Sequence, residues 1–363
     1  MIKKLSILIG IQILSLNWLQ AQSKKDFQQA QFENSLQLPA SFVFADSVVK
    51  KYNILERMSY HNIPSVSIAV IDNGKVVWAK AYGYSNDSLK IPATINTMYQ
   101  AASISKSVNA ICIIKLVQDG KLSLTMDIRQ YLKTWKFPDN GFSKGKDITL
   151  SNLLSHTAGL GTSGFIGYPH NSTLPNTDQM LDGMAPANSE AVKPVIAPNT
   201  KWLYSGGGTL ITKKILNDNI SADYAALLMQ QVLKPLKMQN STFEQPLPAR
   251  YKDHAIAYNN EKKPIPGGYN VYPEQAPDGL WTTPTDYAQF ILSVQSSLAG
   301  KKSLLNKAMA EVMLKPVLAV SNAALGVNVK EVGGEKYFFH SGTTLAIRAS
   351  IMEALLPEKE WLY

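Results

Sequence analysis

Three short motifs of reactive and small residues lie far apart in this 363-residue chain, so a single site built from all three requires a fold that brings distant segments together. The first is the Ser-x-x-Lys sequence at 103–106. The second is the Tyr-Ser-Gly sequence at 204–206, and the third is the His-Ser-Gly sequence at 340–342. A hydroxyl one helical turn before an amine, followed by a tyrosine and a polar segment that ends in glycine, supplies the groups needed for acyl transfer through a serine ester.

The Ser-x-x-Lys pattern occurs three times in the chain, and its context separates the copies. The copy at 47–50 lies inside the amphipathic run 44–60, which predicts a surface helix, and the copy at 143–146 lies in a polar loop interrupted by glycine. Ser103 instead opens the long apolar run 104–117, which predicts a buried helix. We therefore expect Ser103 to be reactive and the other two copies to be inert.

The spacing within the first motif indicates its chemistry. Residues three apart on a helix share one face, so the Lys106 amine is placed to reach the Ser103 hydroxyl. Backbone N–H groups at a helix N-terminus favour developing negative charge, and a serine needs a neighbouring base to become a nucleophile. Two alternatives follow for Lys106. Apolar neighbours lower the pKa of the amine until it serves as the base, or the amine stays charged and holds a tyrosine as phenolate.

Further segments extend these motifs into a family resemblance. The chain resembles the serine β-lactamase and penicillin-binding-protein superfamily, and within it the class C-like branch of β-lactamases, D-amino-acid-specific peptidases and carboxylesterases. Besides the three motifs, the segments at 148–160, 277–281 and 283–286 are similar to family landmarks. The resemblance extends from about residue 40 to the end of the chain.

The resemblance implies a role for each motif residue. Ser103 would be the acylated nucleophile and Lys106 its partner, and Tyr204 would move the proton between serine, leaving group and water. His340 begins the third motif, which is Lys-Thr-Gly in many relatives and His-x-Gly in the esterase-like and peptidase-like ones. The backbone N–H groups of Ser103 and Thr343 would form the oxyanion hole.

Substrate-binding positions follow from the same resemblance, with two departures from the family pattern. The implied positions are Gly206, Ser341, Gly342 and Thr343. Gly206 stands where the family often has asparagine, so a side-chain amide is missing. His340 in place of lysine removes a permanent positive charge. Both departures favour ester or D-amino-acid substrates over β-lactams, which are recognised through a free carboxylate.

Strand patterns lie near both ends of the chain, and helical patterns lie between them. Asn-Gly at 73–74 separates two apolar-rich runs and predicts a hairpin. The predicted strands are 65–71, 75–81, 324–332, 336–340 and 347–352, and a helix is predicted at 284–298. We therefore expect an α+β fold of the β-lactamase/transpeptidase type, in which an antiparallel sheet built from both chain ends is flanked by helices and joined to a mostly helical middle subdomain.

The N-terminus has the pattern of a secretory signal. Residues 1–21 hold a basic start at Lys3 and Lys4, an apolar core, and a small residue suited to cleavage at the end. The alternative is that these residues stay uncleaved and act as an N-terminal membrane anchor. We expect an exported protein, periplasmic or extracellular, without stable membrane insertion after signal removal. A polar leader at 22–40 would precede a single catalytic domain at 41–363, whose α/β part is 41–100 and 283–363 and whose helical part is 101–282.

After His340 the sequence holds one more recognisable strand and a polar turn before it stops at Tyr363. Members of the resembled superfamily continue with another strand and a C-terminal helix that covers the sheet. The chain is therefore expected to be C-terminally truncated, which would leave a strand edge unpaired and an apolar face uncovered. The hypothesis that follows is a product that folds poorly or is inactive despite its intact motifs.

Other function classes find little support in the sequence. The formal net charge is +9, but the lysines are scattered, so no nucleic-acid partner is expected. The segment 159–164 fits a dinucleotide fingerprint by letter but follows a predicted helix, and no metal-binding spacing occurs, so we expect no cofactor and no metal. Cys112, the single cysteine, is expected to be a buried small hydrophobe, and His156 is expected to have a structural hydrogen-bonding role.

The sequence thus predicts an exported serine hydrolase that works through an acyl-enzyme on a small ester, amide, D-amino-acid peptide or β-lactam. The partner would be a small-molecule or cell-wall-peptide-like substrate, and the oligomeric state stays undecided. The alternative is a non-turnover, penicillin-binding-like sensor or truncated pseudoenzyme. The truncation and the missing asparagine favour the alternative, whereas Ser103, Lys106 and Tyr204 favour catalysis.

Overall fold

The computed structural model describes residues 33–34, 36–37, 51–259, 261–332, 334–344 and 348–355, with the backbone alone for 36–37 and 348–355. The chain divides into two compact units, the first up to Val66 and the second from Ser67 onwards. The predicted signal peptide lies outside the described residues, and only four residues of the predicted leader lie within them. No helix in these described segments combines the length and the apolar character needed to cross a lipid bilayer.

The first unit contains a short ribbon and one helix. Strand β1 (Leu36–Gln37) pairs antiparallel with β2 (Lys51–Tyr52), and α2 (Ile54–His61) follows. The Asn53 side chain accepts hydrogen bonds from the first free N–H groups of α2 and so fixes its start. The helix predicted at 44–60 is therefore shorter at its N-terminal end than expected. Residues 44–50 lie outside the described part of the chain.

The predicted hairpin is confirmed. Strand β3 (Ser65–Asp72) is followed by β4 (Lys75–Asn86), and β5 (Ile91–Pro92) pairs antiparallel with β4 in a three-stranded sheet. The two turn residues, Asn73 and Gly74, have φ of 50° and 70°. A two-residue turn with positive φ at both positions matches the twist of the flanking strands, which explains why Asn-Gly is used here.

The middle of the second unit is helical, as the sequence predicted. Its helices are α3 (Ser105–Gln118), α4 (Leu150–Leu154), α5 (Thr177–Asp182), α6 (Gly206–Asn219), α7 (Tyr224–Leu228), α8 (Pro284–Leu298) and α9 (Lys307–Met313). Shorter helical turns lie at Ala102–Ile104, Ile128–Gln130 and Met229–Leu233. Helix α8 matches its predicted range because Thr283 caps its N-terminus and Pro284 occupies its first position.

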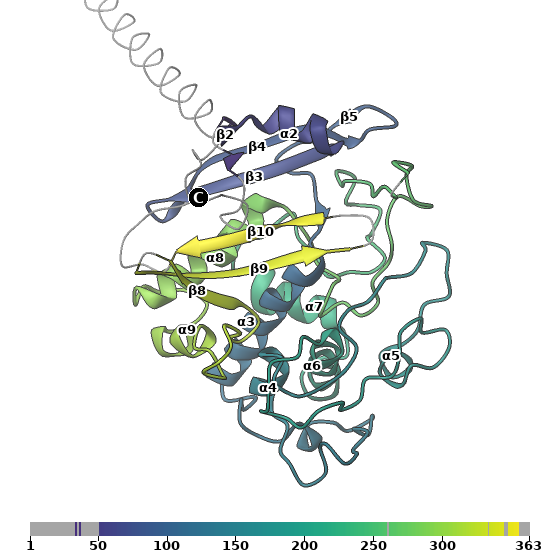
Figure 1. Ribbon diagram of the computed structural model, residues 1–363, viewed down its shortest axis with the longest axis vertical. Helices are drawn as coiled ribbons and strands as arrows, with labels where there is room; N and C mark the ends of the chain where they lie inside the picture. Colours follow the sequence, from purple (N-terminus) through teal and green to yellow (C-terminus); the bar gives the residue numbers. More distant parts are fainter. Residues whose placement is uncertain are drawn as a thin grey trace, which may run out of the picture. The chain divides into compact units, whose positions relative to one another are not determined.

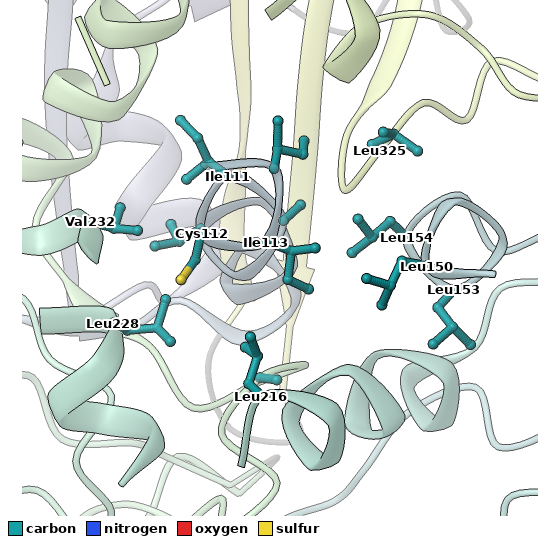
Figure 2. Close-up of a cluster of buried hydrophobic side chains, with 14 of the residues drawn as sticks. Ile111, Cys112, Ile113, Leu150, Leu153, Leu154, Leu216, Leu228, Val232 and Leu325 are labelled. Carbon is teal, nitrogen blue, oxygen red and sulfur yellow. The ribbon is translucent and has the colours of Figure 1, made fainter. Parts of the chain in front are cut away.

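Helix α3 is the centre of the core. Its residues from Ser105 to Ile114 are all buried, as expected for a helix without a polar face. Figure 2 shows its side chains packed among residues of the surrounding helices and of the segment before β8; the labelled neighbours are Leu150, Leu153, Leu154, Leu216, Leu228, Val232 and, in that segment, Leu325. Cys112 lies in this packing, and burial raises the pKa of its thiol to about 12. The prediction that Cys112 is a buried small hydrophobe is confirmed.

The C-terminal strands form a second three-stranded sheet (Figure 1). Its order is β10 (Arg348–Leu355), β9 (Glu335–Thr343) and β8 (Asn328–Val332), and both pairings are antiparallel. The strand predicted from residue 324 begins only at Asn328. Among the described strands, those from the two chain ends pair in separate sheets and do not form one continuous sheet. A short ribbon of β6 (Tyr99–Gln100) and β7 (Trp281–Thr282) links distant parts of the chain.

Gly326 lies where the segment before β8 passes close to α3. Its φ is +75°, and a Cβ there would lie 2.2 Å from the Ala110 Cβ and 3.0 Å from the Lys106 carbonyl oxygen. The backbone segment before β8 can therefore approach α3 only through a glycine.

We expect Gly326→Ala to destabilise the fold by about 3 kcal/mol, because it adds overpacking to left-handed strain. Gly300→Ala is the matched control, since Gly300 also has a positive φ, +70°, but nothing within 4 Å of its Cβ position. That variant should lose only about 1 kcal/mol. Urea unfolding of both variants measures the difference. Equal losses would show that close packing against α3 is unimportant.

Candidate active site

Ser103 lies in a strained turn that leads into α3. The preceding residue, Ala102, has a φ of 47° although it carries a side chain, and it is completely buried. The Ser105 hydroxyl donates to the Ala102 carbonyl oxygen at 2.5 Å and closes the turn. Such left-handed conformations persist only where the surroundings enforce them, and they concentrate at functional sites. The turn leaves Ser103 partly exposed.

Lys106 is buried directly beneath Ser103. Its side chain is 2% exposed, and its Nζ donates to the Ser103 Oγ at 2.9 Å and to the Pro277 carbonyl oxygen at 3.0 Å. The same Nζ lies 5.1 Å from the centroid of the Tyr204 ring. The structure thus brings the first two motifs together, with the lysine between the serine and the tyrosine.

The charge state of Lys106 follows from its neighbours. Burial opposes the charged amine, but the negative charge of Asp278 and the contact with Tyr204 outweigh burial and raise the pKa of Lys106 above its ordinary value. The amine is therefore an ammonium at neutral pH. Of the two alternatives that the sequence left open, this geometry favours the charged lysine.

Asp278 completes this group, and the sequence analysis missed it. Its Oδ1 accepts a hydrogen bond from the Ser103 Oγ at 3.1 Å and lies 3.6 Å from the Lys106 Nζ, while the residue is only 5% exposed. From the sequence, the segment 277–281 that contains Asp278 is distinguished only by its similarity to a family landmark. An acidic residue within the apolar sequence Ala-Pro-Asp-Gly-Leu-Trp was the available signal, since carboxylates are rarely buried without a partner.

Strand pairing places Asp278 beside the serine. The β6–β7 ribbon aligns Gln100 with Trp281, and the Ala101 N–H donates to the Leu280 carbonyl oxygen at 2.8 Å. The Leu280 N–H in turn donates to the Ser105 Oγ at 2.9 Å. Because these bonds hold the segment before β7 against the turn before α3, the carboxylate has a fixed position next to the Ser103 hydroxyl.

Tyr204 precedes α6, and His156 supports it. The Ser205 N–H donates to the His156 Nδ1 at 3.2 Å, and the imidazole ring lies 4.4 Å from the Tyr204 ring, centroid to centroid. Burial, followed by the charge of Lys106, lowers the pKa of His156 well below its ordinary value, so its ring is neutral. The structural hydrogen-bonding role predicted for His156 is confirmed.

The glycines of the second motif allow close packing at the start of α6. The Gly206 N–H donates to the Ser163 carbonyl oxygen at 3.0 Å, and a Cβ on Gly207 would lie 2.7 Å from a Val192 methyl carbon. The glycine-rich segment 159–164 therefore packs against the N-terminus of α6. Gly206 itself lies two residues after Tyr204 and is the first residue of α6, which Ser205 caps.

The third motif lies on β9, where Gly342 packs against the turn that carries Ser103. A Cβ on Gly342 would lie 2.2 Å from the Ala101 carbonyl oxygen and 3.1 Å from the Ser103 nitrogen. The flanking Ser341 and Thr343 are exposed. His340 is buried, and its Nδ1 donates to the Ser341 carbonyl oxygen at 2.7 Å. Burial, followed by the charge of Lys106, lowers the pKa of His340 to about 4, so the ring is neutral at pH 7.

A second buried acid and amine lie close to this site. Glu274 is fully buried, and neither carboxyl oxygen has a hydrogen-bond partner within the described residues. Burial raises the pKa of Glu274 to about 8, and burial lowers the pKa of Lys213 to about 8. Among the residues that the structure describes, no three His, Cys, Asp or Glu side chains gather in a way that could hold a metal ion.

The fold, together with a Ser-x-x-Lys motif whose serine and lysine are hydrogen-bonded, is that of the β-lactamase class of proteins. The Beta-lactamase family model matches residues 52–361, and the chain belongs to this family. Protein flp of Staphylococcus aureus (strain N315) is 27% identical over 228 residues, which are 62% of this chain and 43% of that protein. The teichoic acid D-alanine hydrolase of S. aureus is 26% identical over 249 residues, which are 68% of this chain and 58% of that protein. The chain thus spans about half the length of these curated relatives.

Solved structures support the predicted fold. The octameric penicillin-binding protein homologue from Pyrococcus abyssi matches with a TM-score of 0.69 at 24% identity, over 85% of this chain and 70% of that chain. FmtA from S. aureus matches with a TM-score of 0.58 at 20% identity, over 84% of this chain and 83% of that chain. The predicted α+β fold of the β-lactamase and penicillin-binding-protein type is confirmed.

The buried Glu274 makes stability depend on pH. Its pKa is about 8 in the folded chain and about 4.5 when solvated, so the unfolded state loses this proton first as pH rises. The stability of the wild type therefore falls as pH rises from about 4.5 to about 8, and it stays lost above that range. Glu274→Gln cannot titrate and should be more stable than the wild type by about 4 kcal/mol at pH 8 and by almost nothing at pH 4.5.

Urea unfolding at the two pH values measures this gain. Glu261→Gln is the control, because Glu261 forms an exposed ion pair with Lys263 that solvent screens. Its effect should be small and the same at both pH values. A Glu274→Gln gain that does not change with pH would contradict the raised pKa.

Proposed function

We propose that the chain is an exported serine hydrolase that forms an acyl-enzyme on Ser103, with esters of D-amino acids as the favoured substrate class. The observation that carries the proposal is the 2.9 Å hydrogen bond from the buried Lys106 ammonium to the partly exposed Ser103 hydroxyl. Export rests on the signal pattern of residues 1–21. Amides, D-amino-acid peptides and β-lactams are the other substrates of this chemistry.

Each motif has a role in this proposal. The Ser103 Oγ attacks the substrate carbonyl, and the Lys106 ammonium stabilises the negative charge that develops beside it. The backbone N–H groups of Ser103 and Thr343 bind the carbonyl oxygen, which agrees with the close approach of Gly342 to the Ser103 nitrogen. Tyr204, on the far side of the Lys106 ammonium, exchanges a proton with the leaving group and with water.

The charges around the site support ester substrates. His340 stands where many relatives have lysine, and it is neutral at pH 7, so it adds no cation that would bind a substrate carboxylate. Gly206 brings no side-chain amide to hold a peptide carbonyl. A relative of the chain is named for the hydrolysis of D-alanine from teichoic acid. The net charge of +9 would also draw the protein toward anionic cell-wall polymers.

Ser103→Ala should abolish covalent labelling by a fluorophosphonate probe, because that reagent reacts only with an activated serine. Intact mass measures the reaction, with one adduct expected on the wild type and none on the variant. Ser143→Ala is the control, since Ser143 also begins a Ser-x-x-Lys sequence but donates its hydroxyl to Asp139 at 2.8 Å. It should label like the wild type. An adduct that survives in Ser103→Ala would assign the nucleophile elsewhere.

Lys106→Ala and Tyr204→Phe should each lower the turnover of p-nitrophenyl acetate by about 10²-fold or more, the usual scale for lost acid–base assistance. The lysine variant loses the ammonium next to the nucleophile, and the tyrosine variant loses only the phenol oxygen. Steady-state rates test both, and a rate close to that of the wild type would remove that residue from the mechanism. A wild type that acylates but never releases product would instead be the non-turnover sensor.

A further inference from the structure

We propose that Asp278 is a catalytic residue that accepts the hydroxyl proton of Ser103 when the serine attacks its substrate. The inference rests on the proposed serine hydrolase function and adds to it a group that lies outside the three motifs. The Asp278 Oδ1 is 3.1 Å from the Ser103 Oγ, so it touches the reacting atom itself.

The directions of the hydrogen bonds around Ser103 carry the inference. The Lys106 Nζ donates to the Ser103 Oγ at 2.9 Å, and an ammonium can only donate. It therefore cannot accept the serine proton while it stays charged. The serine hydroxyl has one hydrogen, and the structure directs it to the Asp278 Oδ1. The nucleophile thus lies between a cation that donates to it and an anion that accepts from it.

The carboxylate is held in place by the backbone on both sides. The Lys106 Nζ donates a hydrogen bond to the Pro277 carbonyl oxygen at 3.0 Å, and the Ala101 N–H donates to the Leu280 carbonyl oxygen at 2.8 Å. A Cβ on Gly279 would lie 2.5 Å from the Gln275 Cα, so only glycine fits this tight turn. Asp278 therefore keeps one orientation, and a preorganised group needs no rearrangement when the reaction begins.

The second oxygen of this carboxylate is unsatisfied. The Asp278 Oδ2 is buried and has no hydrogen-bond partner among the described residues. Buried polar atoms are nearly always paired, and an exception calls for an explanation such as catalysis. Catalysis is the explanation that fits here, because the other oxygen of the same carboxylate already accepts from the Ser103 Oγ.

The proposed step is balanced in atoms and charge. The Ser103 Oγ forms a bond to the carbonyl carbon, its proton moves to the Asp278 Oδ1, and the carbonyl electron pair moves to the carbonyl oxygen. When the intermediate collapses, the bond to the leaving oxygen breaks, Tyr204 gives that oxygen a proton, and the proton on Asp278 passes through the Lys106 ammonium to restore the phenol of Tyr204. Water then attacks the acyl-enzyme, and its proton follows the reverse path through Tyr204 and Lys106 to Asp278. Asp278 returns that proton to the Ser103 Oγ as the ester bond breaks.

Four other ionisable groups surround Asp278, and one of them offers a control. Lys106 forms an ion pair with Asp278, and the Tyr204 ring lies against the Lys106 ammonium. Tyr272 and Glu274 are close enough to interact electrostatically with the Asp278 carboxylate. Glu274 is as buried as Asp278 but has no contact with Ser103. Because its pKa is raised to about 8 by burial, it is mostly protonated at pH 7, and glutamine reproduces its charge.

The test is the rate of fluorophosphonate labelling of full-length wild type, Asp278→Asn, Asp278→Ala and Glu274→Gln at pH 7, followed by intact mass. Both Asp278 variants should label about 10²-fold more slowly or worse, as expected for a lost base. Glu274→Gln should stay within about threefold of the wild type. Added sodium formate should accelerate Asp278→Ala in proportion to its concentration, because a small carboxylate fits the space left by the side chain. Formate should not accelerate Asp278→Asn, where the amide fills that space.

The possible results separate the two proposals. A wild type without any adduct would overturn the proposed function and the role of Asp278 with it. If the wild type is labelled and Asp278→Asn is labelled at the same rate, the proposed function stands and only the role of Asp278 is overturned. Slow Asp278 variants that melt like the wild type but gain nothing from formate would reduce Asp278 to a positioning residue for Lys106. If Asp278→Ala does not fold, the near-isosteric Asp278→Asn still decides whether the carboxylate is needed.

Discussion

The buried ammonium of Lys106 is the constraint on which the site depends. A charge removed from water costs several kcal/mol unless it is paired and hydrogen-bonded. Here the Ser103 hydroxyl, the Pro277 carbonyl oxygen and the Asp278 carboxylate surround it, and the Tyr204 ring covers it. These partners come from three distant segments. The fold must therefore hold the turn before α3, the segment before β7 and the start of α6 together if it is to bury this lysine at all.

Glycine makes those approaches possible. Gly342 lets β9 lie against the turn that carries Ser103, and Gly326 lets the segment before β8 lie against α3. Gly279 closes the turn that carries Asp278. Each of these positions would place a Cβ within 2.5 Å of a neighbouring atom, which no side chain tolerates without movement. The positions of the serine, the carboxylate and the third motif thus depend on backbone contacts as much as on side chains.

Local patterns predicted the parts of this structure that local forces determine. Asn73 and Gly74 formed the expected turn, and Thr283 with Pro284 began α8 where expected, because both signals act within a few residues. The apolar run after Ser103 became the buried helix α3 for the same reason. The start of α2 was misplaced since the periodicity of 44–60 carried no information about the Asn53 cap. The separate pairing of the strands from the two chain ends is a tertiary property that no local pattern reports.

Asp278 shows where sequence reasoning about the site ends. It is 175 residues from Ser103 along the chain, and no spacing rule connects them. The β6–β7 pairing and the hydrogen bonds of Leu280 to Ala101 and Ser105 bring them into contact. Once it is in place, the carboxylate balances the lysine, while His156 and His340 are held neutral by burial. The cation beside Ser103 is therefore already engaged by its own anion. Under the proposed function, this balance favours a substrate that is attacked as an ester over one that must be captured through a carboxylate, because that capture would require a cation left free for it.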